Sequence, residues 1–356
     1  MGSFRNPPLL FALAAVAIVV VVALGLVRSG RATVEAMRLP PAPAEAQLAT
    51  PLPFVVEPGT PPETIGAALS DAGVITDAWR FQLLIGLTGS GRDLRAGCYL
   101  FAPATSASEV LRRLRGGLTA SRLLAIPEGR RLQEVGATIE QAGIGTRAQW
   151  EAALASAPVA SLPTPPPPGA SLLGYLLPAS YPVQCKASPE QMVSAMLDAF
   201  TAQVTPAIVA DARARGLSLH QLVTLASIVE REAVLKEEQP VIASVFLNRL
   251  RLGMPLQADP TVQFALAEAN PPGPAGSWWK TVLTDVDLRI ASPYNTYRNA
   301  GLPPGPIANP GINAIVAVAN AAITDYLYFV AKGDGAHAFS RTLDEHNANV
   351  ARYQRR

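Results

Sequence analysis

Residues 218–260 read SLHQLVTLASIVEREAVLKEEQPVIASVFLNRLRLGMPLQADP, and they carry the clearest structural signals in the C-terminal part of the chain. Ser218 is a good N-cap, and Gln221 three residues later completes a capping box. Apolar residues then recur with the helical period of about 100° per residue: Leu219, Leu222, Val223, Ala226, Val229 and Ala233. The pattern predicts a helix, a second helix, and a short loop rich in polar groups.

Glu230 falls inside the apolar arc of the first of these helices, whereas Glu232 falls at its margin. A carboxylate among apolar neighbours is costly to ionise, so its pKa should rise above the ordinary value. A proton held near neutral pH is what a general acid requires. The pattern therefore predicts that Glu230, and not Glu232, holds a proton. The alternative is a structural ion pair between Glu230 and a basic side chain where two helices pack.

Composition narrows the classes of function. The chain has 356 residues, enough for two or three domains, and a net charge of +2. Such a balance gives no electrostatic reason to expect a nucleic-acid partner. Cys98 and Cys185 show neither CxxC nor zinc spacing, and His337 and His346 lack the spacing of metal ligands, so no metal site is predicted.

The N-terminus carries a predicted membrane anchor. Residues 9–27, LLFALAAVAIVVVVALGLV, contain no charge and no proline, and are long enough to cross a hydrocarbon core of about 30 Å. A cleaved signal peptide is the alternative, but its apolar region would be shorter. Residues 1–8 would form a cytoplasmic tail and residues 28–53 a linker. Arginines on both sides of the span leave its orientation open.

The remaining chain is predicted to have α+β architecture. Alternating strand and helix patterns over residues 54–145 indicate a small α+β module. A Pro-rich connection follows over 146–170, and residues 171–356 form a mainly helical domain. Near its end, a strand is predicted over 326–333 and a helix over 337–353.

The loop SPYNTYRNAGLPPGPIANPG, residues 292–311, combines aromatic and amide side chains with several prolines. Aromatic faces suit sugar rings, and amides can hydrogen-bond hydroxyl groups. The loop therefore fits a sugar polymer, with a well-ordered surface loop as the alternative.

Four long motifs occur in one order: LASIVERE (225–232), SVFLNRLRLGMPLQADPTV (244–262), the loop 292–311, and YLYFVAKGDGAHAFSRTLDEHN (326–347). Together they resemble the endolytic murein transglycosylase, or YceG-like, family. The resemblance implies a LysM-like module followed by a mainly helical, lysozyme-like catalytic domain. It also implies a single-pass protein of the bacterial inner membrane, anchored by residues 9–27, with its catalytic domain in the periplasm. That compartment would be oxidising, and whether Cys98 and Cys185 pair stays open.

The activity implied by the resemblance is lytic cleavage of the MurNAc-β-1,4-GlcNAc bond of nascent peptidoglycan strands, which ends strand elongation with 1,6-anhydro-MurNAc. No cofactor is needed, and cell-wall synthases are the implied protein partners. Matching the motifs makes Glu230 the catalytic residue. The substrate-binding candidates are Asn248, Gln257, Asp259, Tyr294, Asn295, Thr296, Tyr297 and Asn309.

Two alternatives remain at this stage. A hydrolytic muramidase would use Glu230 and Asp259 as a pair of carboxylates. A non-catalytic peptidoglycan-binding scaffold would need no acid on an apolar face. Asp259 can instead be the N-cap of the helix that follows it, and the sequence favours this structural role.

Overall fold

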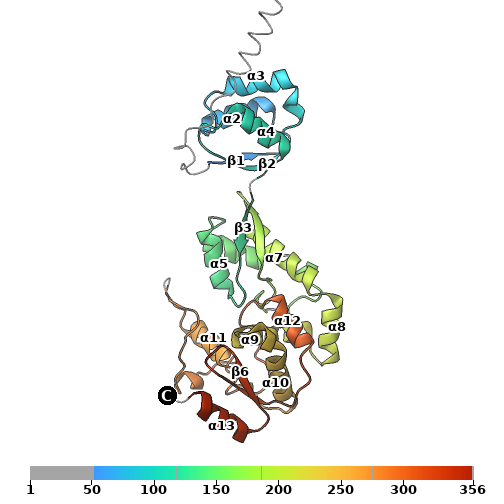
Figure 1. The fold of residues 1–356 in the computed structure, drawn as a ribbon, viewed down its shortest axis with the longest axis vertical. Helices are drawn as coiled ribbons and strands as arrows, with labels where there is room; N and C mark the ends of the chain where they lie inside the picture. The colour runs from blue at the N-terminus through green and yellow to red at the C-terminus, as the bar shows by residue number, and fades with distance from the viewer. Residues whose placement is uncertain (1–51, 118, 120, 186, 274–275, 355–356) are drawn as a thin grey trace, which may run out of the picture. The chain divides into compact units, whose positions relative to one another are not determined.

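Helices and three two-stranded sheets make up the computed structural model, which describes residues 52–117, 119, 121–185, 187–273 and 276–354 (Figure 1). The predicted tail 1–8, the predicted membrane helix 9–27 and all but the last two residues of the linker 28–53 lie outside these ranges. Within them, no single helix has the length and apolar character needed to span a membrane. Only α7 (Pro189–Gln203) and α8 (Pro206–Ala214) taken together pass that test, as a pair bent by 64°.

The described chain divides into two units between Ser121 and Arg122. In the first unit, two strands pair antiparallel with Val55 opposite Cys98, and three helices enclose one apolar core. Its elements are β1 (Leu52–Val56), α2 (Pro62–Asp71), α3 (Ala78–Thr88), η2 (Ser90–Arg92), β2 (Gly97–Phe101) and α4 (Ala107–Gly116).

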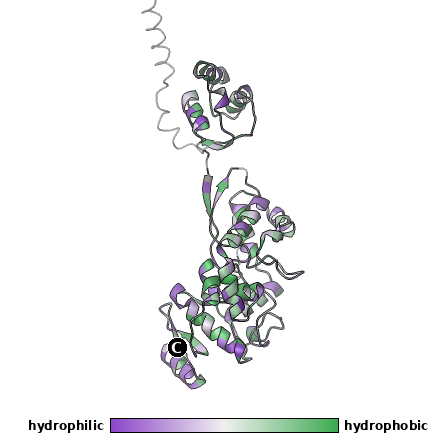
Figure 2. Ribbon diagram, turned by 90° about the vertical axis from the view of Figure 1, so that its right-hand side faces the viewer, coloured by the Kyte–Doolittle hydropathy of each residue, from purple (hydrophilic) through white to green (hydrophobic). Residues whose placement is uncertain are grey.

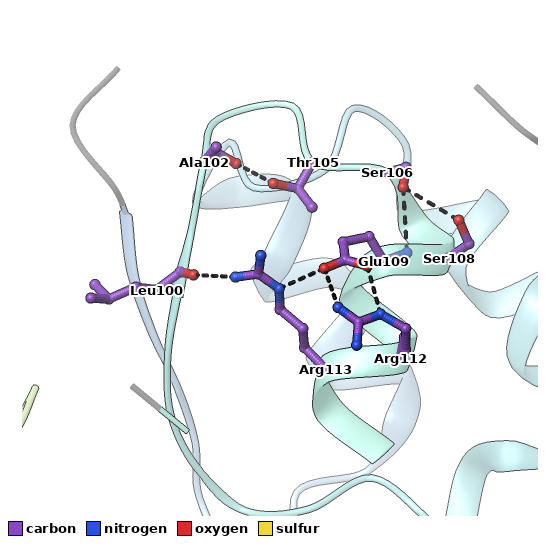
Figure 3. A network of polar contacts seen from close by, with 8 residues as sticks. All are labelled: Leu100, Ala102, Thr105, Ser106, Ser108, Glu109, Arg112 and Arg113. Carbon is purple, nitrogen blue, oxygen red and sulfur yellow. Dashed lines mark hydrogen bonds and ion pairs between the residues drawn. The ribbon is translucent and has the colours of Figure 1, made fainter. Parts of the chain in front are cut away.

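A polar network fastens α4 to the sheet of the first unit (Figure 3). The Glu109 carboxylate accepts hydrogen bonds from Arg112 at 2.7 and 2.8 Å and from Arg113 at 2.7 Å. Arg113 also donates to the carbonyl oxygen of Leu100 in β2 at 3.0 Å. The hydrogen bond from Arg112 is the main reason that the pKa of Glu109 falls to about 2.

The second unit is built around α9 (Leu219–Glu232), which packs against α8, α10, α11 and α12 (Figure 1). The other elements are β3 (Ser121–Ala125), α5 (Leu132–Gln141), α6 (Arg147–Ala155), η3 (Val159–Ser161), β4 (Ser180–Gln184), η4 (Lys236–Glu238), α10 (Gln239–Arg251), α11 (Asp259–Ala269), η5 (Asp287–Arg289), α12 (Ile312–Ala319), β5 (Tyr328–Ala331), β6 (His337–Ser340) and α13 (Leu343–Tyr353).

Every side chain from Leu222 to Val229 is buried, so α9 is enclosed on nearly all sides. In Figure 2 hydrophobic residues predominate on the central helices of this unit, whereas the C-terminal helix is largely hydrophilic. The central position of α9 means that its last turn is held by the whole unit, which fixes the carboxylates found there.

The structure differs from the sequence-based expectations at two places. Residues 122–145, predicted to belong to the first module, group with the second unit, because Val135 and Ile139 of α5 join the same core as α9. The C-terminal helix was predicted from residue 337 but begins at Leu343. Residues 337–340 instead form β6, antiparallel to β5, and Thr342 starts the helix with its own capping box.

Candidate active site

The C-terminal turn of α9 carries both carboxylates singled out by the sequence. The predicted capping box starts the helix: Gln221 N–H donates to Ser218 Oγ at 3.2 Å, and Ser218 N–H donates to Gln221 Oε1 at 2.9 Å. The helix ends at Glu232, and the next residue, Ala233, is extended. Negative charge is unfavourable at this end of a helix, because the helix dipole places its own partial negative charge there.

Glu230 is half-buried, and its Oε2 accepts a hydrogen bond from the backbone N–H of Gly311 at 3.0 Å. Burial is the largest influence on the pKa of Glu230 and raises it above the ordinary value. The bond from Gly311 opposes this rise, the negative charge of Glu128 adds to it, and Lys236 and Arg231 oppose it. The pKa of Glu230 is raised overall, in the direction that the sequence predicted.

A loop that the sequence analysis did not single out lies against Glu230. It follows β3, and its Gly129 N–H donates to the carbonyl of Asn309 at 2.9 Å, while Asn309 N–H donates to the carbonyl of Arg130 at 2.8 Å. Gly129 has a φ of +73°, and a Cβ there would lie 3.7 Å from Cγ of Glu230. The available sequence signal was Pro127 and Gly129 close together at the end of a strand pattern, since proline and glycine mark turns.

Two arginines and two tryptophans form a stacked group beside the site. Arg231 lies over the ring of Trp279 at 3.9 Å, and the indole N–H of Trp279 donates to Glu134 at 3.1 Å. Arg131 is fully buried, lies 4.6 Å from the ring of Trp278, and forms an ion pair with Glu268. These cation–π contacts hold the residue next to Glu230 in place.

Glu232 corrects the prediction that Glu230 alone would hold a proton. Glu232 lines a cavity of about 450 Å³ together with Arg249, Gln257, Asp259 and Tyr297. Burial, followed by the negative charge of Asp259, raises the pKa of Glu232 to about 8. The spacing of residues along α9 could not predict the raised pKa of Glu232, because that spacing shows only neighbours on the same helix. Glu232 is covered by residues that are distant in the sequence.

Asp259 is not the N-cap that the sequence favoured. Ala258 occupies that position, and Asp259 is the first residue of α11. The exposed Asp259 carboxylate accepts a hydrogen bond from the Tyr297 hydroxyl at 2.6 Å. Beside it, Gln257 is exposed and adopts a left-handed backbone with φ of +51°, which costs about 1 kcal/mol or more for a residue other than glycine. Three predicted substrate-binding residues therefore meet at one cavity.

Other predicted substrate-binding residues are buried and hydrogen-bonded within the protein. Asn248 donates to the carbonyls of Thr324 and Tyr326, and Asn295 donates to those of Leu288 and Ile290. These bonds fasten loops to the helices. Both amides are therefore used to hold loops in place, and Asn248 also lines the larger cavity described below.

The last three predicted substrate-binding residues also have partners inside the protein. Thr296 accepts from the backbone N–H of Ala258 at 3.0 Å. Asn309 accepts from Gly174 N–H at 2.8 Å and donates to the carbonyl of Arg130 at 3.0 Å. Tyr294 is half-buried against Phe264, with ring centroids 4.6 Å apart.

A larger cavity of about 890 Å³ lies along the N-terminal half of α9, lined by residues that include Arg215, His220, Asn248 and Arg251. In the part of the chain that the structure describes, no group of three or more His, Cys, Asp or Glu side chains is arranged to hold a metal ion.

The family model described as YceG-like matches residues 54–352 of the chain. A protein of Bacillus subtilis (strain 168) named endolytic murein transglycosylase is 33% identical over 325 residues, which cover 87% of each chain. A protein of the same name from Streptococcus pneumoniae (strain D39) is 30% identical over 83% of this chain and 57% of its own length. A YceG-like protein of Listeria monocytogenes, solved by crystallography, superposes with a TM-score of 0.55 at 31% identity over 85% of this chain and 99% of its own.

Proposed function

The chain belongs to the YceG-like family, and from this premise we propose that it is an endolytic murein transglycosylase, a lyase that cuts peptidoglycan glycan strands. The match over residues 54–352 leaves out only residues 52–53 and 353–354 of the described chain, so it includes every residue of the site. The observation that carries the proposal is the Glu230 carboxyl. It is half-buried at the end of a central helix, with a raised pKa and one backbone donor.

The reaction needs one carboxyl that first gives and then takes a proton. Glu230 protonates the bridging oxygen of the MurNAc-β-1,4-GlcNAc bond, and the C1–O bond breaks with its electron pair leaving on that oxygen. The Glu230 carboxylate then removes the proton from the C6 hydroxyl of the same MurNAc. That oxygen closes onto C1, giving a 1,6-anhydro-MurNAc end and restoring the acid without consuming water.

Three residues at the 450 Å³ cavity, of which Gln257 and Asp259 are exposed and Tyr297 is half-buried, suit a role in holding the glycan. Gln257, Asp259 and Tyr297 offer an amide, a carboxylate and an aromatic face at its edge. Such groups hydrogen-bond sugar hydroxyls and stack on sugar rings. We infer that the strand crosses the end of α9, with the buried residues Asn248, Asn295, Thr296 and Asn309 fixing the loops beneath it.

The cellular setting belongs to the same proposal. Residues 9–27 would anchor the chain in the inner membrane and place the catalytic domain in the periplasm, where nascent strands emerge. The first unit would act as the LysM-like module, and cutting beside cell-wall synthases would terminate strand growth. The apolar character of residues 9–27 and the family membership support this setting.

Digestion of purified sacculi, followed by mass spectrometry of the released fragments, tests the function. The full chain should release fragments with anhydro ends, and Glu230→Gln should lose at least about 100-fold in rate while folding normally. Glu232→Gln is the matched variant, since it makes the same chemical change two residues away in the same helix turn. Full activity of Glu230→Gln would refute the assignment.

The kind of end released separates the alternatives. Reducing ends in place of anhydro ends would indicate a hydrolytic muramidase. Binding to sacculi without any new ends would indicate a scaffold. Loss of activity in Glu232→Gln but not in Glu230→Gln would show that the general acid is Glu232.

A further inference from the structure

Helix α3 of the first unit is apolar on two sides. Its buried side carries Phe81 and Ile85, which belong to the core of the unit. On another side Trp79, Leu83 and Leu87 recur every four residues, and they are 61%, 41% and 69% exposed. A helix in water needs an apolar face only where it meets the core, and large apolar side chains exposed next to one another mark an interaction surface. These three side chains are called the exposed stripe of α3 below.

A basic cavity of about 780 Å³ opens beside the exposed stripe. One wall is formed by Leu84 and Thr88 of α3, each of which lies one residue after a member of the stripe. The rest of the lining comes from the end of η2, the residues after it, and α4. It holds one carboxylate, that of Asp93, and four arginines: Arg92, Arg95, Arg112 and Arg115. Positive charge therefore predominates next to the stripe.

Two of these arginines have no fixed counter-charge. Arg112 and Arg115 each have a carboxylate partner, at 2.7 and 3.6 Å respectively. Among the residues that the structure describes, no carboxylate lies within ion-pair distance of Arg92 or Arg95, and both side chains are exposed. Unpaired positive charges gathered at a cavity favour the approach of an anion.

A bilayer that contains anionic phospholipid matches both the stripe and the cavity. Its interface accepts apolar side chains among the upper parts of the acyl chains, and tryptophan is favoured at that depth. Its phosphate groups attract arginine, and each arginine near the surface strengthens binding severalfold. A glycan strand could stack on Trp79 but would leave Leu83 and Leu87 in water, so lipid is the better match.

The predicted anchor would keep the first unit close to a bilayer. Residues 9–27 are the predicted membrane helix, and the unit begins at Leu52. A coil of the length of the predicted linker between them would span roughly 25–30 Å. This is about the diameter of a domain as small as the first unit, so α3 can turn toward the same bilayer.

We propose that the first unit docks onto an anionic phospholipid surface, with the exposed stripe inserted into the interface and Arg92 and Arg95 binding lipid phosphates. Helix α3 then lies in the plane of the membrane surface. The arginines supply an attraction that salt weakens, and the stripe supplies one that salt does not weaken. This docking goes beyond the proposed reaction and does not depend on which carboxyl of α9 is the acid.

Quenching of tryptophan fluorescence by lipids brominated on their acyl chains tests the proposal, with the full chain in vesicles. The difference between the wild type and Trp79→Phe isolates the emission of Trp79, because the other tryptophans lie in the second unit. In phosphatidylcholine vesicles with about 30% phosphatidylglycerol, we expect brominated lipid to quench Trp79 at least about twofold. Without phosphatidylglycerol, or in about 0.5 M NaCl, the quenching should fall by more than half.

Variants separate the two parts of the surface. The double variant Arg92→Gln and Arg95→Gln should lower quenching in the anionic vesicles to the level seen in phosphatidylcholine alone. The double variant Leu83→Gln and Leu87→Gln should lower it in both kinds of vesicle. Arg147→Gln neutralises an exposed arginine of the second unit, so it is the matched control and should behave as the wild type.

Unquenched Trp79 in the anionic vesicles would overturn the proposal, as would quenching that the arginine variant leaves unchanged. A response of Trp79 to peptidoglycan fragments without quenching by lipid would show a glycan-binding face instead. Lipid composition and salt test the wild type directly, so the result does not depend on the folding of a variant. Release of anhydro ends from sacculi is measured separately, which distinguishes a failure of docking from a failure of the proposed function.

Discussion

Glu232→Gln should make stability less dependent on pH. Burial and Asp259 raise the pKa of Glu232 to about 8 in the folded chain, from an ordinary value of 4.5. A raised acid pKa means that the folded state binds the proton more tightly than the unfolded state. The contribution of this group to stability is therefore complete below pH 4.5 and is lost as pH rises toward 8.

The difference in the pKa of Glu232 between the folded and unfolded states sets how much stability is lost as pH rises. Each unit of pKa difference corresponds to about 1.4 kcal/mol, so the limit above pH 8 is about 5 kcal/mol. Glu232 lines a cavity and keeps some contact with water, which reduces the penalty of ionisation. We expect about half of the limit, so the free energy of unfolding of the wild type should fall about 2 kcal/mol more than that of Glu232→Gln between pH 4.5 and 9.

Urea unfolding from pH 4.5 to 9, followed by tryptophan fluorescence, measures this difference. Trp150, Trp278 and Trp279 lie in the second unit and dominate the signal. Glu237→Gln, an exposed carboxylate, serves as the control and should follow the wild type. Equal pH dependence in the wild type and Glu232→Gln would refute the argument that Glu232 is protonated near neutral pH.

Substitutions at three further positions probe the residues that support the site. Asn309→Ala removes the acceptor of Gly174 N–H and the donor to the Arg130 carbonyl, and should cost about 2–4 kcal/mol in urea unfolding; a cost below 0.5 kcal/mol would contradict this. Trp279→Ala should lower the free energy of unfolding by about 3 kcal/mol, whereas Trp279→Phe keeps the ring over Arg231 and should lower it by about 1. Gly311→Ala should push out the Glu128 side chain and break its ion pair with Lys236, with less than about 1 kcal/mol lost in urea unfolding; a loss of several kcal/mol would contradict this.

Local patterns in the sequence were sufficient to place α9. Its start follows from Ser218 and Gln221, since a capping box needs only residues three apart. The apolar spacing identified its buried face, and the raised pKa of Glu230 followed from that face. The order of four motifs indicated the family, which the comparisons confirmed.

The surroundings of that helix turn depend on contacts between segments that are distant in the sequence. The periodicity of apolar residues describes one helix or strand at a time. It could not show that Asp259 lies near Glu232, or that Glu128 and Glu230 both lie beside Gly311. Nor could it predict that Gln257 is exposed and Asn295 is buried, because both are polar residues in loops. The sequence determined which carboxylates stand at the end of α9, because a helix depends on local spacing. Packing between distant segments decided how strongly each one holds its proton, because burial and neighbouring charge depend on the whole fold.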